Sequence, residues 1–323
     1  MKHKKTFSAV LFIYFFSISH LCFGWGFFAH KLINKTAVFS LPTPLFQFYK
    51  DNIFYITESA VNPDKRRCII ENEAEKHFID LDNYSKEEQK NMPKKWFDAI
   101  SKYSEKNLRE HGISPWNIIF MKKKLIDAMK KGDAKQILKL SAEVGHYIAD
   151  ANVPLHTTKN YNGQLTDQNG IHGFWESRLP ELFSDKYDLF VGTAKKIYSL
   201  EDRVWEAINS ANNCLEKIFE NEKKLSEKFK NKKYGYEKRG SVLQKVYSYK
   251  FSKAFHDSIN GMVEEQMRKS IKMVADFWYT CWVEAGMPNL NSLEKNLCKT
   301  LSEEEKKEIS EAKKISKKFR DCE

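Results

Sequence analysis

Apolar residues recur three or four positions apart along most of the chain, which is the spacing of amphipathic helices. We expect such helices over residues 121–133, 133–152, 203–225 and 258–286. Pro154 marks the end of the second helix, and Gly286 with Pro288 marks the end of the last. Because strand-like alternation is scarce, the pattern predicts an all-α protein built as a single multi-helix domain.

Three segments depart from the helical pattern. Residues 159–170 are rich in Asn and Gly and are expected to form a loop between helices. Residues 223–240 are basic and weakly hydrophobic, which predicts a mobile connector. Residues 299–323, after Cys298, mix both charges with little apolar face, so we expect a charged tail that is an exposed helix or a frayed end.

The first 24 residues have the pattern of a secretory signal peptide. A lysine-rich start precedes an apolar run that is too short to span a bilayer, and the small residues Cys22 and Gly24 favour cleavage between Gly24 and Trp25. A lipoprotein cut before Cys22 and an uncleaved anchor are the alternatives. Clean cleavage predicts a secreted or periplasmic protein with no stable membrane anchor.

The charge balance is mildly basic. The chain has 54 Lys and Arg residues against 43 acidic ones, and residues 1–24 hold three of the lysines and none of the acids. The remaining chain therefore has 51 basic residues against 43 acidic ones, a net charge of +8. Such a balance favours nucleic acid or an anionic surface as a partner, although solvated surface lysines explain it equally well.

The cysteine pattern does not predict a fold held together by disulfide bonds. Five remain after the expected cleavage: Cys68, Cys214, Cys281, Cys298 and Cys322. An odd number leaves at least one thiol unpaired, so a disulfide framework is not expected to hold the fold together. No two of them form a C-x-x-C pair, and their wide spacing does not resemble a thiolate zinc site. A metal bound by this chain would need nitrogen and oxygen ligands.

Two histidine–carboxylate pairs stand out as metal ligands. The stretch "GHYIADANVPLH" places His146 and Asp150 four residues apart, and "IHGFWESRLP" does the same for His172 and Glu176. Residues four apart on a helix project from one face, so each pair presents a nitrogen and an oxygen to one point. His156 follows the first pair across a proline and can turn toward the same place. Such donors begin many zinc sites, whereas helix-surface hydrogen bonds are the simpler explanation.

The residue after the expected cleavage site adds another donor. As the first residue, Trp25 would carry an α-amino group with a pKa of roughly 7.7–8.0. A metal ion can displace that proton, after which the amine nitrogen and the Trp25 carbonyl oxygen chelate it and His30 adds a third contact. Asp64 and His77 lie between His30 and the two pairs, and their value as ligands depends on this cluster.

Together these residues resemble the tri-zinc hydrolase superfamily that contains secreted bacterial phospholipase C and the single-strand-specific zinc nucleases of fungi and plants. Those all-α proteins begin with a zinc-binding tryptophan, followed by H, D, H, H-x(3)-D-x(5)-H and H-x(3)-D/E. The chain matches this pattern in order with Trp25, His30, Asp64, His77, His146, Asp150, His156, His172 and Glu176. The motifs cover residues 25–183, and the resemblance implies a zinc-dependent phosphodiesterase domain over residues 25–298.

The resemblance also implies three zinc ions. The first would be held by Asp64, His77, His146 and Asp150, the second by the Trp25 amine and carbonyl, His30 and Asp150, and the third by His156, His172 and Glu176. Two zinc ions that share Asp150 would lie about 3.5–4 Å apart and lower the pKa of a water between them, which attacks phosphorus. Asp150, as the bridge, and Asp64, which would orient that water, are the expected catalytic residues. His111 and His256 have no role in the pattern.

The same resemblance indicates where a substrate would bind. Arg67, three residues after the first acid of the pattern, stands where the nucleases carry a basic residue near the scissile phosphate. Phe78 and Asp80 stand where the nucleases grip a base, although phospholipases have a similar Phe and Asp, and core packing explains Phe78 equally well. Phe28 and Lys65 do not resemble the residues that cradle choline in the phospholipase.

Residues of the expected third zinc site resemble the phospholipases in one position and the nucleases in another. Glu176, where the nucleases have aspartate, resembles the phospholipase branch, but Trp175 just before it resembles the nucleases. We favour single-stranded nucleic acid or nucleotides as the phosphodiester substrate, with phospholipid head groups as the alternative. A secreted zinc-binding protein without turnover is a third interpretation. A zinc ion with only three protein ligands favours catalysis over that interpretation, because it leaves a position open for water.

Overall fold

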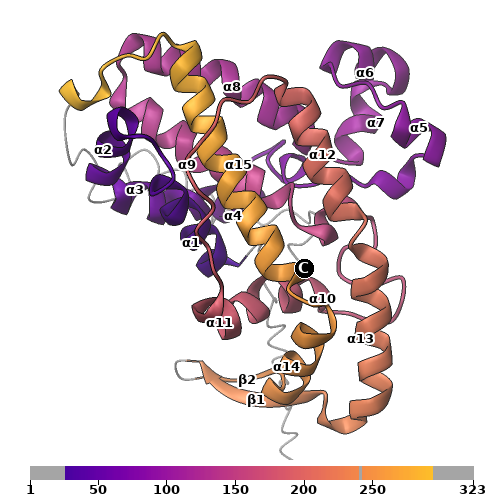
Figure 1. The fold of residues 1–323 in the computed structure, drawn as a ribbon. Coiled ribbons are helices and arrows are strands. Elements are labelled where there is room, and N and C mark those ends of the chain that lie inside the picture. The colour runs from indigo at the N-terminus through magenta and orange to yellow at the C-terminus, as the bar shows by residue number, and fades with distance from the viewer. Residues whose placement is uncertain (1–25, 240–241, 294–323) are drawn as a thin grey trace, which may run out of the picture.

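The structure, a computed structural model, describes residues 26–239 and 242–293. Within this part of the chain the all-α prediction is confirmed, since one mostly helical domain carries a single two-stranded sheet (Figure 1). The predicted signal peptide, Trp25 and the predicted tail of residues 299–323 lie outside the described residues. None of the described helices combines the length and the apolar character needed to cross a membrane.

The helices and strands follow one another with short connections. In chain order they are α1 (Phe27–Val38), α2 (Thr43–Asp51), α3 (Ile53–Glu58), α4 (Asn62–Arg67), α5 (Lys86–Lys90), α6 (Trp96–Tyr103), α7 (Glu105–Glu110), α8 (Ser114–Lys131), α9 (Ala134–Asp150), α10 (Ile171–Gly173), α11 (Leu179–Phe183), α12 (Leu200–Asn212), α13 (Leu215–Phe229), β1 (Tyr234–Arg239), β2 (Val242–Tyr247), α14 (Tyr249–Ser258) and α15 (Met262–Glu284). A π-helical turn, Phe174–Arg178, joins α10 to α11. Figure 1 shows α5, α6 and α7 as a lobe at one end and the two strands at the other.

The core that carries the site forms where α15 packs against α1, α8 and α9. Ile271, Val274 and Trp278 lie at helical spacing on α15 and are fully buried. Each such side chain stabilises the fold by about 1.5–3 kcal/mol relative to an exposed one. The Trp278 ring stacks on Tyr49 at 4.8 Å between centroids, and its Nε1 donates to the Ser141 carbonyl oxygen at 3.1 Å. These contacts fix α9 against α15.

The helix predicted over residues 133–152 is confirmed as α9. Asp133 caps its start, because its side chain accepts a hydrogen bond from the Gln136 backbone N–H at 3.1 Å. The helix ends at Asp150, shortly before Pro154, as expected. The two ligands that this helix carries therefore lie in its last, buried turn.

Helices α1 and α9 approach each other closely at Gly145. A Cβ atom added there would lie 2.1 Å from Asn34 Oδ1, so only glycine fits at this crossing. The Asn34 side chain in turn donates to the Ala142 carbonyl oxygen at 3.0 Å, which ties the two helices together. As a consequence the rings of His30 and His146, one from each helix, stack with centroids 3.9 Å apart.

Two predicted helices have different boundaries in the structure. The segment 203–225 is divided between α12 and α13 by a short turn. The segment 258–286 begins with the last residue of α14, and α15 starts only at Met262 because Gly261 takes a left-handed conformation, with φ of 73°. Gly286 follows the end of α15 with φ of 91°, as its predicted role requires.

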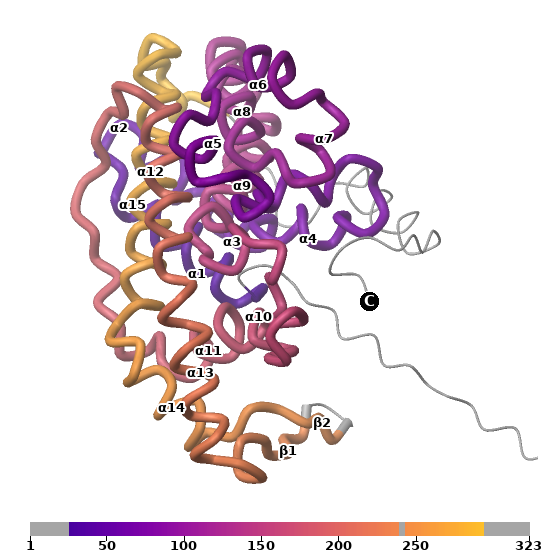
Figure 2. The backbone as a smooth tube through the Cα atoms, turned by 90° about the vertical axis from the view of Figure 1, so that its right-hand side faces the viewer, coloured from indigo at the N-terminus to yellow at the C-terminus, as the bar shows by residue number. Residues whose placement is uncertain are grey.

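The prediction of a connector over residues 223–240 is wrong. Its first part continues α13, and its second part is β1, which pairs with β2 in an antiparallel hairpin. The hairpin forms because Tyr234 and Tyr247, directly opposed on the two strands, pack with ring centroids 5.0 Å apart, and Tyr247 also contacts the buried Phe251. The many lysines of the segment obscure this aromatic pair. Figure 2 shows the hairpin projecting from the helices.

Candidate metal centre

Eight of the nine predicted metal ligands lie in the described residues, and none of the eight is more than 3% exposed. Their positions are His30 in α1, Asp64 in α4, His77 after a 3-10 helix (Ala74–Lys76), His146 and Asp150 in α9, His156 in a 3-10 helix (Pro154–Thr157), His172 in α10 and Glu176 in the π-helical turn. Three groups of donor atoms result: His30, Asp64 and His146; His77, His146 and Asp150; and His156, His172 and Glu176. The structure thus brings distant segments together as three buried groups compatible with a multinuclear metal site.

Asp150 lies between two sets of histidines. Its Oδ2 atom is 2.9 Å from His77 Nδ1 and 3.2 Å from His146 Nε2. Its Oδ1 atom is 3.4 Å from His30 Nε2, on the other side of the carboxylate. The two oxygens of one carboxylate therefore face two different donor groups, which is the arrangement that a bridging ligand requires.

Asp64 approaches the same histidines from α4. Its Oδ1 atom lies 3.6 Å from His146 Nε2 and 3.8 Å from His77 Nδ1, and its Oδ2 atom lies 4.0 Å from His30 Nε2. Ligands at about 2.0–2.1 Å from a tetrahedral zinc ion are separated by roughly 3.3 Å. The separations around Asp64 and Asp150 lie on both sides of that value, so the donor spacing suits an ion of this size.

The third group forms across the predicted loop of residues 159–170, which the structure confirms as a series of turns. Glu176 Oε2 lies 3.0 Å from His172 Nε2 and 3.5 Å from His156 Nε2. The chain between His172 and Glu176 passes from α-helix into the π-helical turn, and both side chains still face one point. Widened turns of this kind occur frequently at functional sites.

Two of the histidines are oriented by backbone carbonyl groups. His146 Nδ1 donates to the Ala60 carbonyl oxygen at 2.9 Å, and His156 Nδ1 donates to the His77 carbonyl oxygen at 2.7 Å. Because a carbonyl can only accept, Nδ1 carries a proton in each ring, which leaves Nε2 as the nitrogen that can bind a metal ion. In both rings Nε2 faces the donor groups. Metal-binding histidines are usually held in this way by their second nitrogen.

Burial sets the charge of the donors. It lowers the pKa of His77 and of His156 to about 3, and it also lowers the pKa of His30. Burial alone would raise the pKa of Asp150, but the surrounding histidines, His146 foremost, hold it well below its ordinary value. Neutral imidazoles and an ionised carboxylate are the forms that bind a metal ion.

Several buried donor atoms lack a hydrogen bond among the described residues. His30 Nε2 and Asp150 Oδ1 face each other without forming one, and His156 Nε2 forms none with Glu176. A buried polar atom without a partner costs about 1–3 kcal/mol. A cation placed between such atoms would satisfy them, and the set of imidazole and carboxylate donors is one that zinc accepts. The residues present therefore fit divalent metal ions.

All three predicted substrate residues are buried in the structure. Arg67 lies at the donor groups, with Nη1 3.7 Å from Asp64 Oδ1, and it is 2% exposed. Phe78 and Asp80 are also buried, at 6% and 5% exposed. The Phe78 ring packs beside Gly112, where an added Cβ atom would lie 2.6 Å from it. Phe78 is thus largely covered by the protein in this structure, and Arg67 is the charged side chain placed at the centre.

A buried ionic network behind the centre has no counterpart in the sequence analysis. Tyr147 donates a hydrogen bond to Glu73, and Arg66 pairs with Glu73 at 3.0 Å and with Glu143 at 2.7 Å. The Tyr147 ring meets the His77 ring edge-on, with centroids 5.3 Å apart. The network is therefore linked to His77 through the ring of Tyr147. The one sequence feature that could have indicated this network is the position of Tyr147 directly after the candidate ligand His146.

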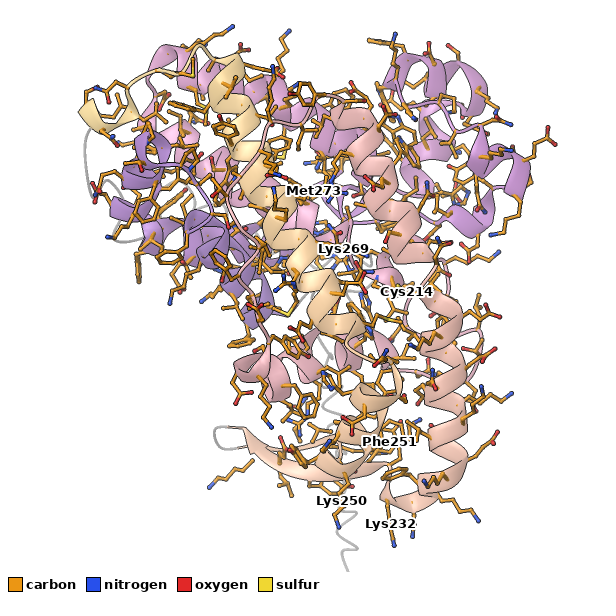
Figure 3. All side chains as sticks on the ribbon, in the orientation of Figure 1. Cys214, Lys232, Lys250, Phe251, Lys269 and Met273 are labelled. Carbon is orange, nitrogen blue, oxygen red and sulfur yellow. The ribbon has the colours of Figure 1, made fainter. Side chains whose placement is uncertain are left out.

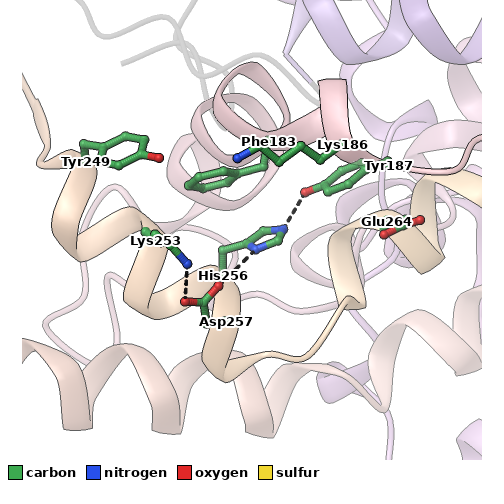
Figure 4. Close-up of a pocket in the computed structure, with 8 residues that line it drawn as sticks. All are labelled: Phe183, Lys186, Tyr187, Tyr249, Lys253, His256, Asp257 and Glu264. Atoms are coloured by element: carbon green, nitrogen blue, oxygen red, sulfur yellow. Dashed lines mark hydrogen bonds and ion pairs between the residues drawn. The ribbon is translucent and has the colours of Figure 1, made fainter.

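A separate pocket of about 230 Å³ lies between α11, α14 and the start of α15 (Figure 4). Its lining residues are Phe183, Lys186, Tyr187, Tyr249, Lys253, His256, Asp257 and Glu264. His256 shares a hydrogen bond of 2.8 Å with the Tyr187 hydroxyl, and Lys253 pairs with Asp257 at 2.7 Å. None of the metal-compatible groups in the described residues includes His256 or His111.

Comparison with known proteins adds no family to this description. No family model matches the chain, and no curated protein shows significant similarity to it. What can be stated of the chain is therefore the geometry itself: a helical domain that buries histidine and carboxylate donors in three adjoining groups.

Proposed function

We propose that this protein is a secreted or periplasmic zinc-dependent hydrolase of phosphate esters. The observation that carries the proposal is the position of Asp150, whose two carboxylate oxygens face separate histidine groups 2.9–3.4 Å away. A carboxylate shared in this way is characteristic of centres with two metal ions, which stabilise both the attacking and the leaving oxygen of a displacement at phosphorus.

The side chains have distinct tasks in this proposal. When bound, zinc supplies Lewis acidity and lowers the pKa of a water nucleophile toward neutrality. Asp150 holds two of the binding positions together, and Asp64 accepts a hydrogen bond that orients the attacking water. Arg67, buried beside Asp64, neutralises the negative charge that increases on the phosphate oxygens in the transition state. The burial of these groups strengthens each electrostatic interaction.

We further propose that the new amino terminus at Trp25 completes the set next to His30. Its neighbour Gly26 is buried, donates to the Glu176 carbonyl oxygen at 3.2 Å, and would collide with Ser177 if it carried a Cβ atom. The first described residue is thus tied to the turn that carries Glu176. Retention of one extra residue before Trp25 should remove one zinc ion per chain and most of the activity. Equal zinc content and activity in the extended and processed forms would contradict this role.

The favoured substrate is single-stranded nucleic acid or nucleotides. A buried arginine beside the donor groups and the basic balance of the chain support a polyanionic substrate. Phospholipid head groups are the second candidate, favoured by glutamate rather than aspartate at position 176. A secreted zinc-binding protein without turnover is the third.

One experiment separates these three functions. The processed, zinc-loaded protein is incubated with single-stranded DNA, RNA and phosphatidylcholine, with and without a chelator, and the phosphate products are measured. Products from the nucleic acids that disappear with the chelator are expected. Products from phosphatidylcholine alone would favour the phospholipase, and full zinc loading without any product would favour the binding protein.

A further inference from the structure

One region of the chain carries a large excess of positive charge. Residues 228–253 hold nine lysine or arginine residues and one acid, Glu237, which is a net charge of +8. The whole chain has a net charge of +11, and residues 1–24 contribute three lysines and no acid. Outside these two segments the charges balance. The region around the hairpin therefore accounts for the entire excess that remains after residues 1–24.

Within this region one face of the hairpin is exposed and mixes lysine with apolar side chains. Tyr236 is directly opposite Lys245, and Lys238 is directly opposite Leu243, so these four side chains share a face. Tyr236 is 69% exposed and Leu243 is 66% exposed, and both lysines are exposed as well. We call these four residues the hairpin face. It carries two positive charges and no acid.

The base of the same face is anchored in the protein. Tyr234 and Tyr247, the next opposed pair, pack against each other, and Tyr247 is only 7% exposed. Lys245 Nζ lies 4.2 Å from the centre of the Tyr234 ring, which holds this lysine against the hairpin. Lys232 and Lys250, both exposed, lie at the same end of the molecule (Figure 3). The cationic groups are thus presented on a fixed support.

The hairpin contacts the π-helical turn that carries Glu176. Glu237 pairs with Arg178, whose Nη1 lies 2.7 Å from Glu237 Oε2, and Arg178 follows Glu176 in the π-helical turn. At the base of the hairpin face, Phe174, from the start of the same turn, stacks on Tyr247 at 3.9 Å and 19°. The one acid of the region is therefore occupied by an internal ion pair. These two contacts join the hairpin to the turn that carries Glu176.

We propose that the hairpin face, with the flanking Lys232 and Lys250, binds single-stranded nucleic acid and extends the substrate surface beyond the metal centre. This inference rests on the proposed function. A single strand offers a charged backbone to the lysines and open base faces to the Tyr236 ring. A membrane surface fits less well, because interfacial binding requires a continuous apolar face, and here Leu243 stands between lysines.

The test measures binding by the processed, zinc-loaded protein. A fluorescent phosphorothioate oligothymidylate, which resists cleavage, is titrated at several salt concentrations. The double variant Lys238→Glu with Lys245→Glu should weaken binding about tenfold or more and reduce the log–log salt slope by about 1.4, since each neutralised phosphate contributes about 0.7. Tyr236→Ala should weaken binding about fivefold or more through lost stacking, without changing the slope.

A matched control has the same change in charge elsewhere. Lys123 and Lys124 are exposed on α8, and Lys123→Glu with Lys124→Glu should leave binding nearly unchanged. Equal effects of the two double variants would overturn the proposal. It would also be overturned if the protein does not bind the oligothymidylate but binds anionic phosphatidylserine vesicles, and the hairpin variants abolish that vesicle binding. Circular dichroism confirms that each variant is folded.

Turnover separates failure of this inference from failure of the proposed function. The hairpin variants should raise KM for a long oligothymidylate and leave kcat/KM for a dinucleotide unchanged. If the protein cleaves both substrates equally well with or without the hairpin lysines, the proposed function stands and the role of the hairpin face is wrong. If the protein binds the strand through these lysines but cleaves no phosphodiester, only the proposed function is wrong.

Discussion

His146 and His256 are both helical histidines near a carboxylate, yet they lie in very different surroundings. His146 is fully buried, donates from Nδ1 to a carbonyl oxygen, and directs Nε2 toward Asp150 at 3.2 Å. His256 lies at the edge of an open pocket, where its Nε2 bonds to the Tyr187 hydroxyl and its Nδ1 is 3.9 Å from Asp257 (Figure 4).

The two histidines differ in the ion-pair partners of their neighbouring carboxylates, Asp150 and Asp257. Asp257 is paired with Lys253 on the preceding turn of its helix, so its charge is already balanced. Among the described residues no lysine or arginine pairs with Asp150, whose ion-pair partners are histidines. Between these two pairs, burial and the absence of a lysine or arginine partner distinguish Asp150 from Asp257.

The largest expected effect follows from removal of the shared charge. Asp150→Asn should release at least two zinc ions per chain and reduce kcat/KM roughly a thousandfold, about 4 kcal/mol of transition-state stabilisation. Zinc is measured by elemental analysis and turnover by product release. The matched variant Asp257→Asn should retain all zinc and full activity. If both variants lose zinc to the same extent, the contrast between the two pairs is wrong.

Metal removal should change stability as well. Ions that bind only the folded state at about a thousand times their Kd add about 4 kcal/mol. For a domain of this size a chelator should therefore lower Tm by about 10 °C. Scanning calorimetry of the zinc-loaded and chelated protein measures this shift. His256→Ala should show the same shift as the parent, whereas a variant of His146 should show little or none.

The network behind His77 predicts a dependence on acid. Burial alone would raise the pKa of Glu73, but Arg66 and Lys76 outweigh it and lower the pKa to about 2 from an ordinary 4.5. The ionised form is therefore the stabilising one, and its contribution of about 3 kcal/mol is present above pH 4.5 and lost as pH falls toward 2. Denaturant titrations at several pH values measure it.

Glu73→Gln should remove that contribution and flatten the acid branch of the stability curve. The exposed Glu105, which pairs with Arg109, provides the control, and Glu105→Gln should change the curve little. A Glu73 variant with an unchanged slope between pH 4.5 and 2 would show that the network does not hold this carboxylate ionised.

The smallest effect concerns the hydrogen bond of His256. Tyr187→Phe removes a neutral hydrogen bond in a half-open pocket and should lower the free energy of unfolding by about 1 kcal/mol. Zinc content and turnover should stay at the parent values. A loss of zinc in this variant would place His256 in the metal centre, contrary to the contrast drawn above.

Local spacing predicted the parts of the centre that lie on one helix. His146 with Asp150, and His172 with Glu176, required only a helical repeat to be brought together, and each pair does converge. His30, Asp64 and His77 come from separate segments, so only resemblance to a known pattern could connect them. Their convergence depends on helix packing, which residue spacing does not encode.

Other parts of the structure depend on pairing between residues that the chain pattern hides. The hairpin exists because Tyr234 meets Tyr247 across the strands, and the surrounding lysines dilute that signal. The contact of Arg66 with Glu73 and Glu143 likewise joins residues up to 77 positions apart. The predicted helices are present because a helical repeat is encoded locally. The hairpin and the ionic network could not be predicted because their partner residues are far apart in the sequence.

The contact between Gly145 and Asn34 makes the candidate centre dependent on a residue that donates nothing to it. A methyl group at that position would collide with the Asn34 side chain, whose hydrogen bond to Ala142 joins the helices that carry His30 and His146. We expect the methyl group to break this bond and loosen the helix crossing. Affinity for an ion would then fall without the loss of a single ligand. In the proposed zinc centre, side-chain volume at this helix crossing would therefore influence ion affinity alongside the imidazoles.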